Sequence, residues 1–136
     1  MKPIRIALNG ETSIGADRLT LALLANAYRE ETVEGETRVV LAIKPSLAPL
    51  KVGVFPLVKK DGMPEIAQKL YMQLRSKYAV EYDGKQAIGK RYARMDEIGT
   101  PFCFTIDGDT LTDRTVTVRE RDTMSQERIA LDKVES

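Results

Sequence analysis

The short segment Glu11–Arg18 holds side chains that could bind a charged ligand: a carboxylate, a hydroxyl, and an arginine near a helix start. The carboxylate of Glu11 can accept hydrogen bonds from an ammonium group, and the hydroxyl of Ser13 can add another hydrogen bond. Gly15 allows the backbone to approach a ligand closely. Arg18 begins a helix and offers forked donors to phosphate oxygens, which also favour a helix start. On the pattern alone, an ordinary loop with helix-capping residues explains the same segment.

Composition excludes several other kinds of site. The 136 residues include no histidine and one cysteine, Cys103. A Ser-His-Asp or Cys-His hydrolase is therefore excluded, a zinc site is disfavoured, and no internal disulfide can form. Three carboxylates, at Asp107, Asp109 and Asp113, suggest part of a calcium loop, but the rest of such a loop is missing and a hairpin turn is favoured. We expect no metal site and no bound cofactor.

Hydropathy and charge bear on location and partners. No apolar run approaches the roughly 20 residues that a membrane helix requires, and residues 1–8 show no cleavage-site pattern. Because a single cysteine suits a reducing compartment, we expect a cytoplasmic protein without membrane contact. The net charge is +1, yet residues 51–100 carry ten basic and six acidic side chains. That local excess can steer a polyanion to one face, although a solvated surface without a partner is the simpler interpretation of charge alone.

Helices alternating with strands must position these residues. Apolar side chains cover much of the circumference of a helix predicted at 17–28, which is typical of a helix buried within a larger body. Apolar periodicity and turn residues predict the other elements: an exposed turn at 34–36, strands at 38–43, 51–58, 79–82, 102–106 and 115–120, helices at 64–78 and 88–98, and turns at 83–84 and 107–109. A domain boundary is expected near residues 46–49.

The last part of the chain predicts a returning strand and a final helix. Side chains alternate along the strand, valines on one face and polar residues on the other: Val116 and Val118 against Thr115, Thr117, Arg119 and Arg121. Thr123 and Gln126 have the spacing of a capping box, which predicts a helix that buries Ile129, Leu131 and Val134. The order of elements after residue 46 predicts an α/β fold, a mixed β-sheet flanked by helices.

Three stretches carry a family resemblance. Residues 91–103, Arg-Tyr-Ala-Arg-Met-Asp-Glu-Ile-Gly-Thr-Pro-Phe-Cys, resemble glycyl-tRNA synthetases, as do residues 116–129, which contain Arg-Glu-Arg-Asp-Thr-Met. Residues 47–52 are similar to the opening of the anticodon-binding domain shared by class IIa synthetases. The resemblance covers residues 9–134, and residues 1–8 do not obviously fit it.

The resemblance implies a C-terminal fragment with two parts. Residues 1–45 would be a remnant of a class II catalytic domain, with a loop, a helix and a strand, and residues 46–136 would be the anticodon-binding domain. By resemblance, the glycine pocket is lined by Glu11, Thr12, Ser13, Ile14 and Gly15, and ATP by Gly15, Ala16, Asp17 and Arg18. The family's other two active-site motifs are missing, so we expect no aminoacylation by this chain alone. The full-length family is a homodimer that uses ATP with magnesium to attach glycine to tRNA.

For the second part, the resemblance implies binding to the anticodon region of glycine tRNA, a single-stranded loop with splayed bases. The expected phosphate contacts are Lys59, Lys60, Lys85, Lys90, Arg91 and Arg94. The candidates for base recognition are Arg119 and Arg121 for base edges, Tyr92 and Phe55 for stacking, and Asp96 and Glu97 for accepting from cytosine amino groups. Each has a structural alternative, since the arginines can pair with nearby carboxylates and Phe55 can belong to the core.

Two other functions remain open. The same fold can serve as an accessory or interaction module that does not aminoacylate, although such a module needs no amino-acid pocket. A free-standing small enzyme is disfavoured, because the chain has no self-contained catalytic set. Binding that discriminates glycine tRNA from a tRNA with altered anticodon bases would favour the synthetase interpretation over the accessory module.

Overall fold

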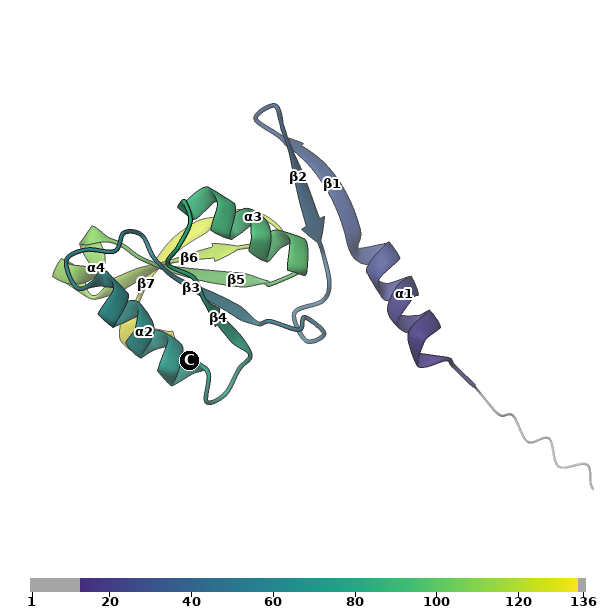
Figure 1. Ribbon diagram of the computed structural model, residues 1–136, viewed down its shortest axis with the longest axis horizontal. Helices are drawn as coiled ribbons and strands as arrows, with labels where there is room; N and C mark the ends of the chain where they lie inside the picture. The colour runs from purple at the N-terminus through teal and green to yellow at the C-terminus, as the bar shows by residue number, and fades with distance from the viewer. Residues whose placement is uncertain (1–12, 135–136) are drawn as a thin grey trace, which may run out of the picture.

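A five-stranded sheet forms the centre of the protein, with its strands in the order β4-β3-β5-β6-β7 (Figure 1). The computed structural model describes residues 13–134. The strands are β3 (Val52–Pro56), β4 (Val80–Tyr82), β5 (Phe102–Ile106), β6 (Thr115–Glu120) and β7 (Gln126–Ala130). β3 runs parallel to β4 and β5, whereas β6 pairs antiparallel with β5 and β7. The predicted mixed sheet is confirmed.

Two helices cover opposite faces of this sheet. They are α2 (Met63–Leu74) and α3 (Ile88–Ile98). Val54 packs on the α2 side with Leu70, while its neighbour Phe55 packs on the α3 side with Met95. Because successive strand residues point to opposite faces, β3 serves two cores and every one of its residues is buried. α2 ends four residues earlier than the helix predicted from apolar spacing.

A short helix replaces the hairpin turn predicted at 107–109. This helix, α4 (Gly108–Asp113), connects β5 to β6. The Asp107 side chain accepts a hydrogen bond from the backbone N–H of Thr110 at 3.1 Å, and the Thr110 hydroxyl accepts one from the backbone N–H of Asp107 at 3.1 Å. These two reciprocal bonds satisfy donors that the start of a helix leaves free.

The segment after β6 is a strand, so the predicted final helix is wrong. Thr123 does act as a cap, but it caps a turn. Its hydroxyl donates to the Glu120 carboxylate at 2.6 Å and accepts from the backbone N–H of Ser125 at 3.2 Å. β7 then pairs with β6, and a single 3₁₀ turn follows at Leu131–Lys133. The three residues expected to be buried in the helix pack, partly buried, against the α2-side core: Ile129, Leu131 and Val134.

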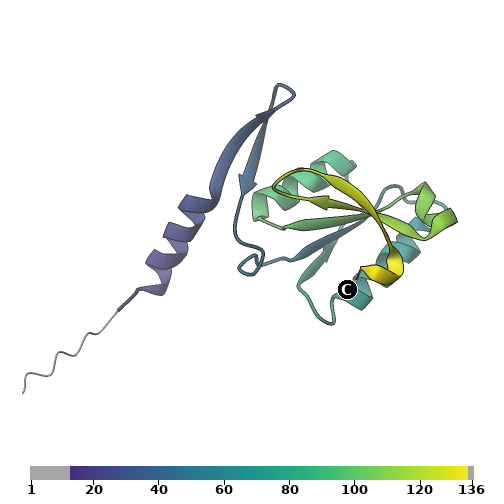
Figure 2. The ribbon, with the colours of Figure 1, turned by 180° about the vertical axis from the view of Figure 1, so that it is seen from behind.

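The first described residues form an arm beside the sheet (Figures 1 and 2). The arm consists of α1 (Ala16–Ala27), β1 (Tyr28–Val33) and β2 (Glu36–Leu41), and β1 and β2 pair as an antiparallel hairpin. Its turn lies at Glu34 and Gly35, which both have positive φ. β1 was not predicted, because a ribbon with exposed faces needs no apolar alternation and the charged run 29–31 looks like a loop.

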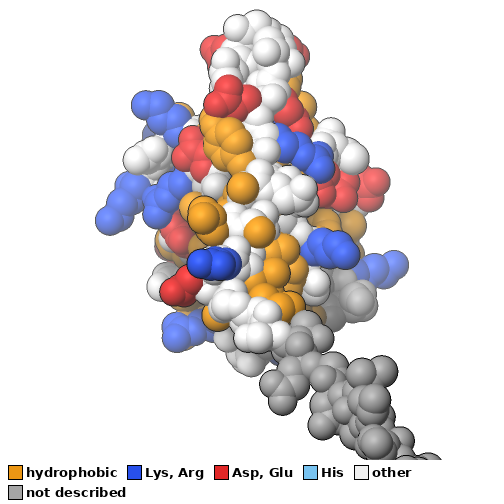
Figure 3. Space-filling view, turned by 90° about the vertical axis from the view of Figure 1, so that its right-hand side faces the viewer, with side chains coloured by type: hydrophobic (Ala, Val, Ile, Leu, Met, Phe, Trp, Pro, Cys, Tyr) orange, Lys and Arg blue, Asp and Glu red, His pale blue; other side chains and the backbone are white. Residues whose placement is uncertain are grey.

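α1 leaves most of its apolar surface open. Four leucines, Leu19, Leu21, Leu23 and Leu24, are 40% to 68% exposed, and Ala27 is the buried residue of the helix. Figure 3 views the molecule from the side of the arm and shows hydrophobic side chains gathered along it. The helix itself was predicted, but its burial is not seen. Within residues 13–134, no helix is both long and apolar enough to cross a membrane.

Candidate nucleic-acid interface

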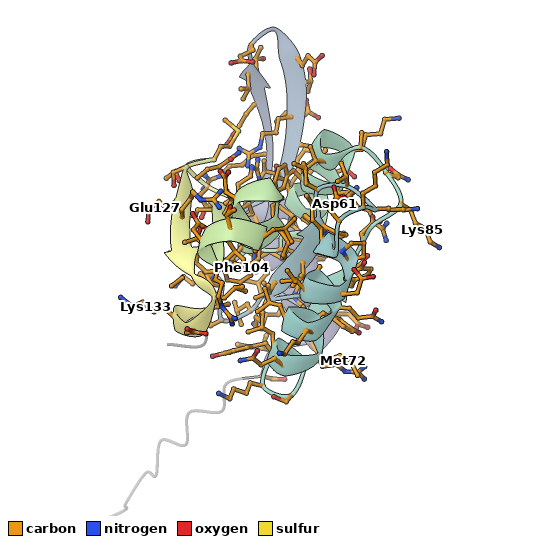
Figure 4. All side chains as sticks on the ribbon, turned by 90° about the vertical axis from the view of Figure 1, so that its left-hand side faces the viewer. Asp61, Met72, Lys85, Phe104, Glu127 and Lys133 are labelled. Atoms are coloured by element: carbon orange, nitrogen blue, oxygen red, sulfur yellow. The ribbon has the colours of Figure 1, made fainter. Side chains whose placement is uncertain are left out.

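Basic side chains meet where β3 and β4 end. Lys59 lies in the loop after β3, Lys85 in the loop after β4, and Arg94 on α3, and all three line one groove of about 480 Å³. Parallel strands place their carboxyl ends at the same edge of a sheet, which brings these loops together. Lys85 points into solvent, near the loop that holds Asp61 (Figure 4). We call this surface the basic groove: Lys59, Tyr82, Lys85 and Arg94, with Glu81 and Asp83 also in its lining.

The outer face of α3 extends the positive surface. Lys90, Arg94 and Glu97 follow each other at helical spacing and are all exposed. Arg94 is paired at the surface, with Glu81 at 2.8 Å and Asp83 at 3.5 Å, while its side chain stays 52% exposed. Because exposed ion pairs contribute little, such pairing leaves the guanidinium able to exchange a carboxylate for a phosphate.

Arg91 supports the basic groove from inside. It is buried, and its guanidinium donates to the backbone carbonyl of Pro56 at 2.5 Å and to that of Gln86 at 2.6 Å. These bonds tie α3 to the end of β3 and to the loop that carries Lys85. The same loop is fixed by a bond from the backbone N–H of Lys85 to the Asp83 carboxylate at 2.8 Å. Arg91 therefore shapes the groove and does not face it.

Sequence reasoning missed Tyr82, the one aromatic side chain among the residues that line the basic groove. It is half-buried, and its ring lies 6.1 Å from the ring of Tyr71 at a tilt of 59°. Burial raises the pKa of Tyr82 above its ordinary value, so the phenol stays neutral. Its position directly before the Asp83-Gly84 turn was the available signal, since the last residue of a strand at this edge faces the groove region.

Three more of the sequence candidates lie inside the protein. Asp96 and Arg119 form two hydrogen bonds, at 2.9 and 3.0 Å, and both side chains are buried. Burial lowers the pKa of Arg119, but the hydrogen bonds and the charge of Asp96, together with the neighbouring Cys103 and Tyr92, outweigh burial and raise that pKa above its usual value. Arg121 is also buried and donates to backbone carbonyls of Gly99 and Ile43, each at 2.8 Å. Asp96 and Arg119 nevertheless line one hollow of about 480 Å³ beside the hairpin, together with Tyr92 and Glu97, whereas Arg121 is not among its lining residues.

The aromatic candidates lie in the same interior. Phe55 belongs to the α3-side core, which confirms the alternative that Phe55 is a core residue. Tyr92 is partly buried between that core and Arg119, whose guanidinium lies 4.8 Å from the ring centroid. The Tyr92 hydroxyl shares a 2.5 Å hydrogen bond with Thr105. Of the residues that the sequence suggested for RNA contact, the structure leaves these exposed: Lys59, Lys60, Lys85, Lys90, Arg94 and Glu97.

The acidic cluster around α4 is paired with one arginine. Arg128 of β7 donates to the Asp107 carboxylate at 2.7 Å and lies 3.7 Å from Asp109 and 3.8 Å from Asp113. The hydrogen bond from Arg128 lowers the pKa of Asp107 to about 2. Within residues 13–134, no group of three or more histidine, cysteine or carboxylate side chains is arranged to hold a metal ion.

The segment expected to contact glycine and ATP lies at the start of the arm. Glu11 and Thr12 lie outside the described residues, and residues 13–18 are all exposed. Gly15 precedes the first turn of α1 in an extended conformation, and its carbonyl accepts from the backbone N–H of Leu19 at 3.0 Å. Arg18 stands in that first turn. Figures 1 and 2 both show α1 apart from the five-stranded sheet, so the two candidate sites belong to separate parts of the molecule.

Comparison with known proteins relates this sequence to the glycyl synthetases. A family model described as "Anticodon binding domain" matches residues 51–136. The glycine–tRNA ligase of Rhodopirellula baltica is 55% identical over 131 residues, covering 93% of this chain and 24% of that protein. That of Caldanaerobacter subterraneus is 57% identical over 125 residues, covering 92% and 27%. The chain thus spans about a quarter of the length of these curated relatives.

Solved structures share the fold. A prolyl-tRNA synthetase from Cryptosporidium parvum, complexed with L-proline and AMP, superposes with a TM-score of 0.63 at 24% identity, covering 73% of this chain and 22% of that one. The RNA-binding domain of threonyl-tRNA synthetase from the same organism gives a TM-score of 0.57 at 25% identity, covering 63% and 22%. The two glycine–tRNA ligases described above confirm the resemblance to glycyl-tRNA synthetases noted from the sequence.

Proposed function

Because this chain belongs to the family of anticodon-binding domains, we propose that it binds the anticodon region of glycine tRNA as one part of a glycine–tRNA ligase. The observation that carries this proposal is the basic groove, where Lys59, Lys85 and Arg94 meet at the carboxyl ends of parallel strands. Ligands of open α/β sheets tend to bind outside this edge, because the loops there diverge.

The groove offers the contacts that a single-stranded loop requires. Lys59, Lys85 and Arg94 would hold backbone phosphates, with Lys60 and Lys90 beside them. Tyr82, neutral and partly exposed, would stack on an unpaired base. Glu97, on the outer face of α3, would accept a hydrogen bond from the amino group of a cytosine. In this proposal, the role of Asp96, Arg119 and Arg121 is to stabilise the fold, because all three are buried.

Aminoacylation belongs in this proposal to a full-length ligase. There, the segment Glu11–Arg18 would contribute to the sites for glycine and ATP, and the enzyme would act in the cytoplasm as a homodimer. In this chain, residues 13–18 lie exposed at the start of one helix. Aligning two substrates and stabilising a developing phosphate charge requires an enclosing set of groups. One helix start cannot provide that set, so the chain alone would not activate glycine.

Filter binding with a transcript of glycine tRNA tests the proposed function. Affinity should fall with salt, and Lys85→Ala should weaken binding and reduce the slope of log affinity against log salt by about one counterion. Lys69→Ala is the matched control, because Lys69 is an exposed lysine on α2 that lines a different groove. If Lys69→Ala and Lys85→Ala have the same effect, the basic groove is not the binding site. No measurable affinity at low ionic strength would refute RNA binding altogether.

A second RNA separates the proposal from the accessory-module alternative. A transcript with altered anticodon bases should bind more weakly than the cognate transcript, by a factor of about 5 or more for one lost base contact. Lys85→Ala should weaken both transcripts equally, since phosphates carry no sequence information. Equal binding of the two transcripts by the unaltered chain would favour the accessory module.

A further inference from the structure

The arm meets the rest of the protein across a buried group of charged side chains. Arg38 comes from β2, Asp96 from α3, Arg119 from β6, and Arg121 from the residue after β6. Their side chains are 10%, 3%, 8% and 2% exposed, respectively. We call this group the arginine clamp: Arg38, Asp96, Arg119 and Arg121. We call residues 51–134 the module.

Arg38 joins three separate segments with one guanidinium. It donates to the Asp96 carboxylate at 3.0 Å and to the Glu31 carboxylate, on the neighbouring strand β1, at 2.7 Å. It also donates to the backbone carbonyl of Arg121. Two of these three partners belong to the module, so one side chain of the hairpin is fixed against both α3 and the end of β6. A planar fork of donors suits such a junction, whereas an ammonium group does not.

Asp96 connects this junction to the sheet. Both of its oxygens accept from Arg119, and the oxygen that bonds Arg38 is one of them. A single buried carboxylate therefore serves two arginines. Because a buried charge without its partner is strongly unfavourable, the cluster disfavours any position of Arg38 away from Asp96.

A second attachment lies beyond the end of β2. Arg121 donates to the backbone carbonyl of Ile43, in the link that follows the hairpin, and to that of Gly99, where α3 ends. Space is tight at this point, since a Cβ at Gly99 would lie 2.8 Å from the backbone oxygen of Leu41. Val40, between the two attachments, is 1% exposed. The hairpin is thus held by hydrogen bonds at both ends of a close-packed contact.

We propose that the arginine clamp fixes the orientation of the arm on the module, so that α1 and α3 turn as one rigid body. α1 runs directly into β1, and the backbone N–H of Ala42 donates to the carbonyl of Ala27 at 2.7 Å, which ties the end of α1 to the hairpin. The clamp thereby sets where the start of α1, with Gly15 and Arg18, lies relative to the basic groove. This role does not depend on RNA binding.

Distances between two spin labels test the clamp in the full chain. Exposed positions Thr32, on β1, and Gln68, on α2, are replaced by cysteine and labelled. Cys103 needs no replacement, because it is 2% exposed and burial raises its pKa to about 12. The labelled parent should give one narrow distance distribution. Arg38→Met removes all three hydrogen bonds and should broaden the distribution about twofold or more, because the arm then samples several orientations.

Arg29→Met is the matched control, because Arg29 is an exposed arginine on the other strand of the same hairpin. It should leave the distribution as narrow as in the parent. Arg38→Lys keeps the charge beside Asp96 but cannot reach three partners, so it should give an intermediate width. If Arg38→Met fails to fold, Arg38→Lys decides. A width equal to that of the Arg29→Met control in the folded Arg38 variant overturns the proposal.

Discussion

Replacing Asp96 by alanine should destabilise the protein more than any surface substitution. Asp96 as a whole is 2% exposed, and its carboxylate accepts two hydrogen bonds from Arg119 and one from Arg38. Without it, two guanidinium groups remain buried and lose their shared counter-charge. Breaking a buried ion pair in this way costs about 3–5 kcal/mol. That is a large part of the roughly 5–15 kcal/mol by which domains of this size are stable.

Urea unfolding, followed by far-ultraviolet circular dichroism, measures this cost. With a slope of about 1.5–2 kcal/mol per molar, the midpoint should fall by about 2 M while the slope stays unchanged. Glu97→Ala is the control, because Glu97 is the next residue on α3 and is exposed. Its effect should stay within about 0.5 kcal/mol. A loss below about 1 kcal/mol for Asp96→Ala would show that water replaces the carboxylate and that the cluster is not desolvated.

The low pKa of Asp107, about 2 against the ordinary 3.8 of an aspartate, contributes stability that is present above about pH 4 and is lost as the pH falls toward about 2. Urea unfolding across the acid range should therefore show that the free energy of unfolding falls more steeply with pH in the parent than in Arg128→Ala. Parallel curves of this free energy against pH would contradict the role of Arg128. The buried thiol of Cys103, with its pKa raised to about 12, should react with a disulfide reagent only as fast as the protein unfolds; an immediate reaction of the native chain would disprove its burial. Glycine-dependent pyrophosphate exchange by this chain should stay at background, and any activity above it would show that a complete site forms.

The elements with strong end signals could be predicted from the sequence. α3 and β5 have the predicted bounds, because Gly99, with φ +83°, ends the helix and Pro101 separates it from the strand. β7 could not be recognised, because Thr123 caps a turn with the same spacing that it would use in a helix. The apolar residues at 129 and 131 also fit the two-residue period of a strand, and only the pairing with β6 decides between the two.

The sequence indicated which kinds of residue form the candidate site, but it indicated less well where the fold places them. Basic residues between 59 and 94 were chosen by charge, and Lys59, Lys85 and Arg94 do meet in one groove. The alternation along β6 correctly placed Arg119 on the face opposite Val116. It could not show that α3 covers this face, because the partner Asp96 lies 23 residues away in the sequence. Whether a polar face of a strand meets solvent or a helix is decided by tertiary packing.

The open leucines of α1 affect how the isolated chain would behave in a test tube. A helix with exposed leucines favours self-association as the protein concentration rises, and it favours capture by chaperones during expression. A dimer or larger particle seen for this chain alone would then reflect burial of these leucines between copies of the chain. Size measurements would consequently say little about how complete synthetases assemble, unless Leu19 and Leu23 were first exchanged for polar residues.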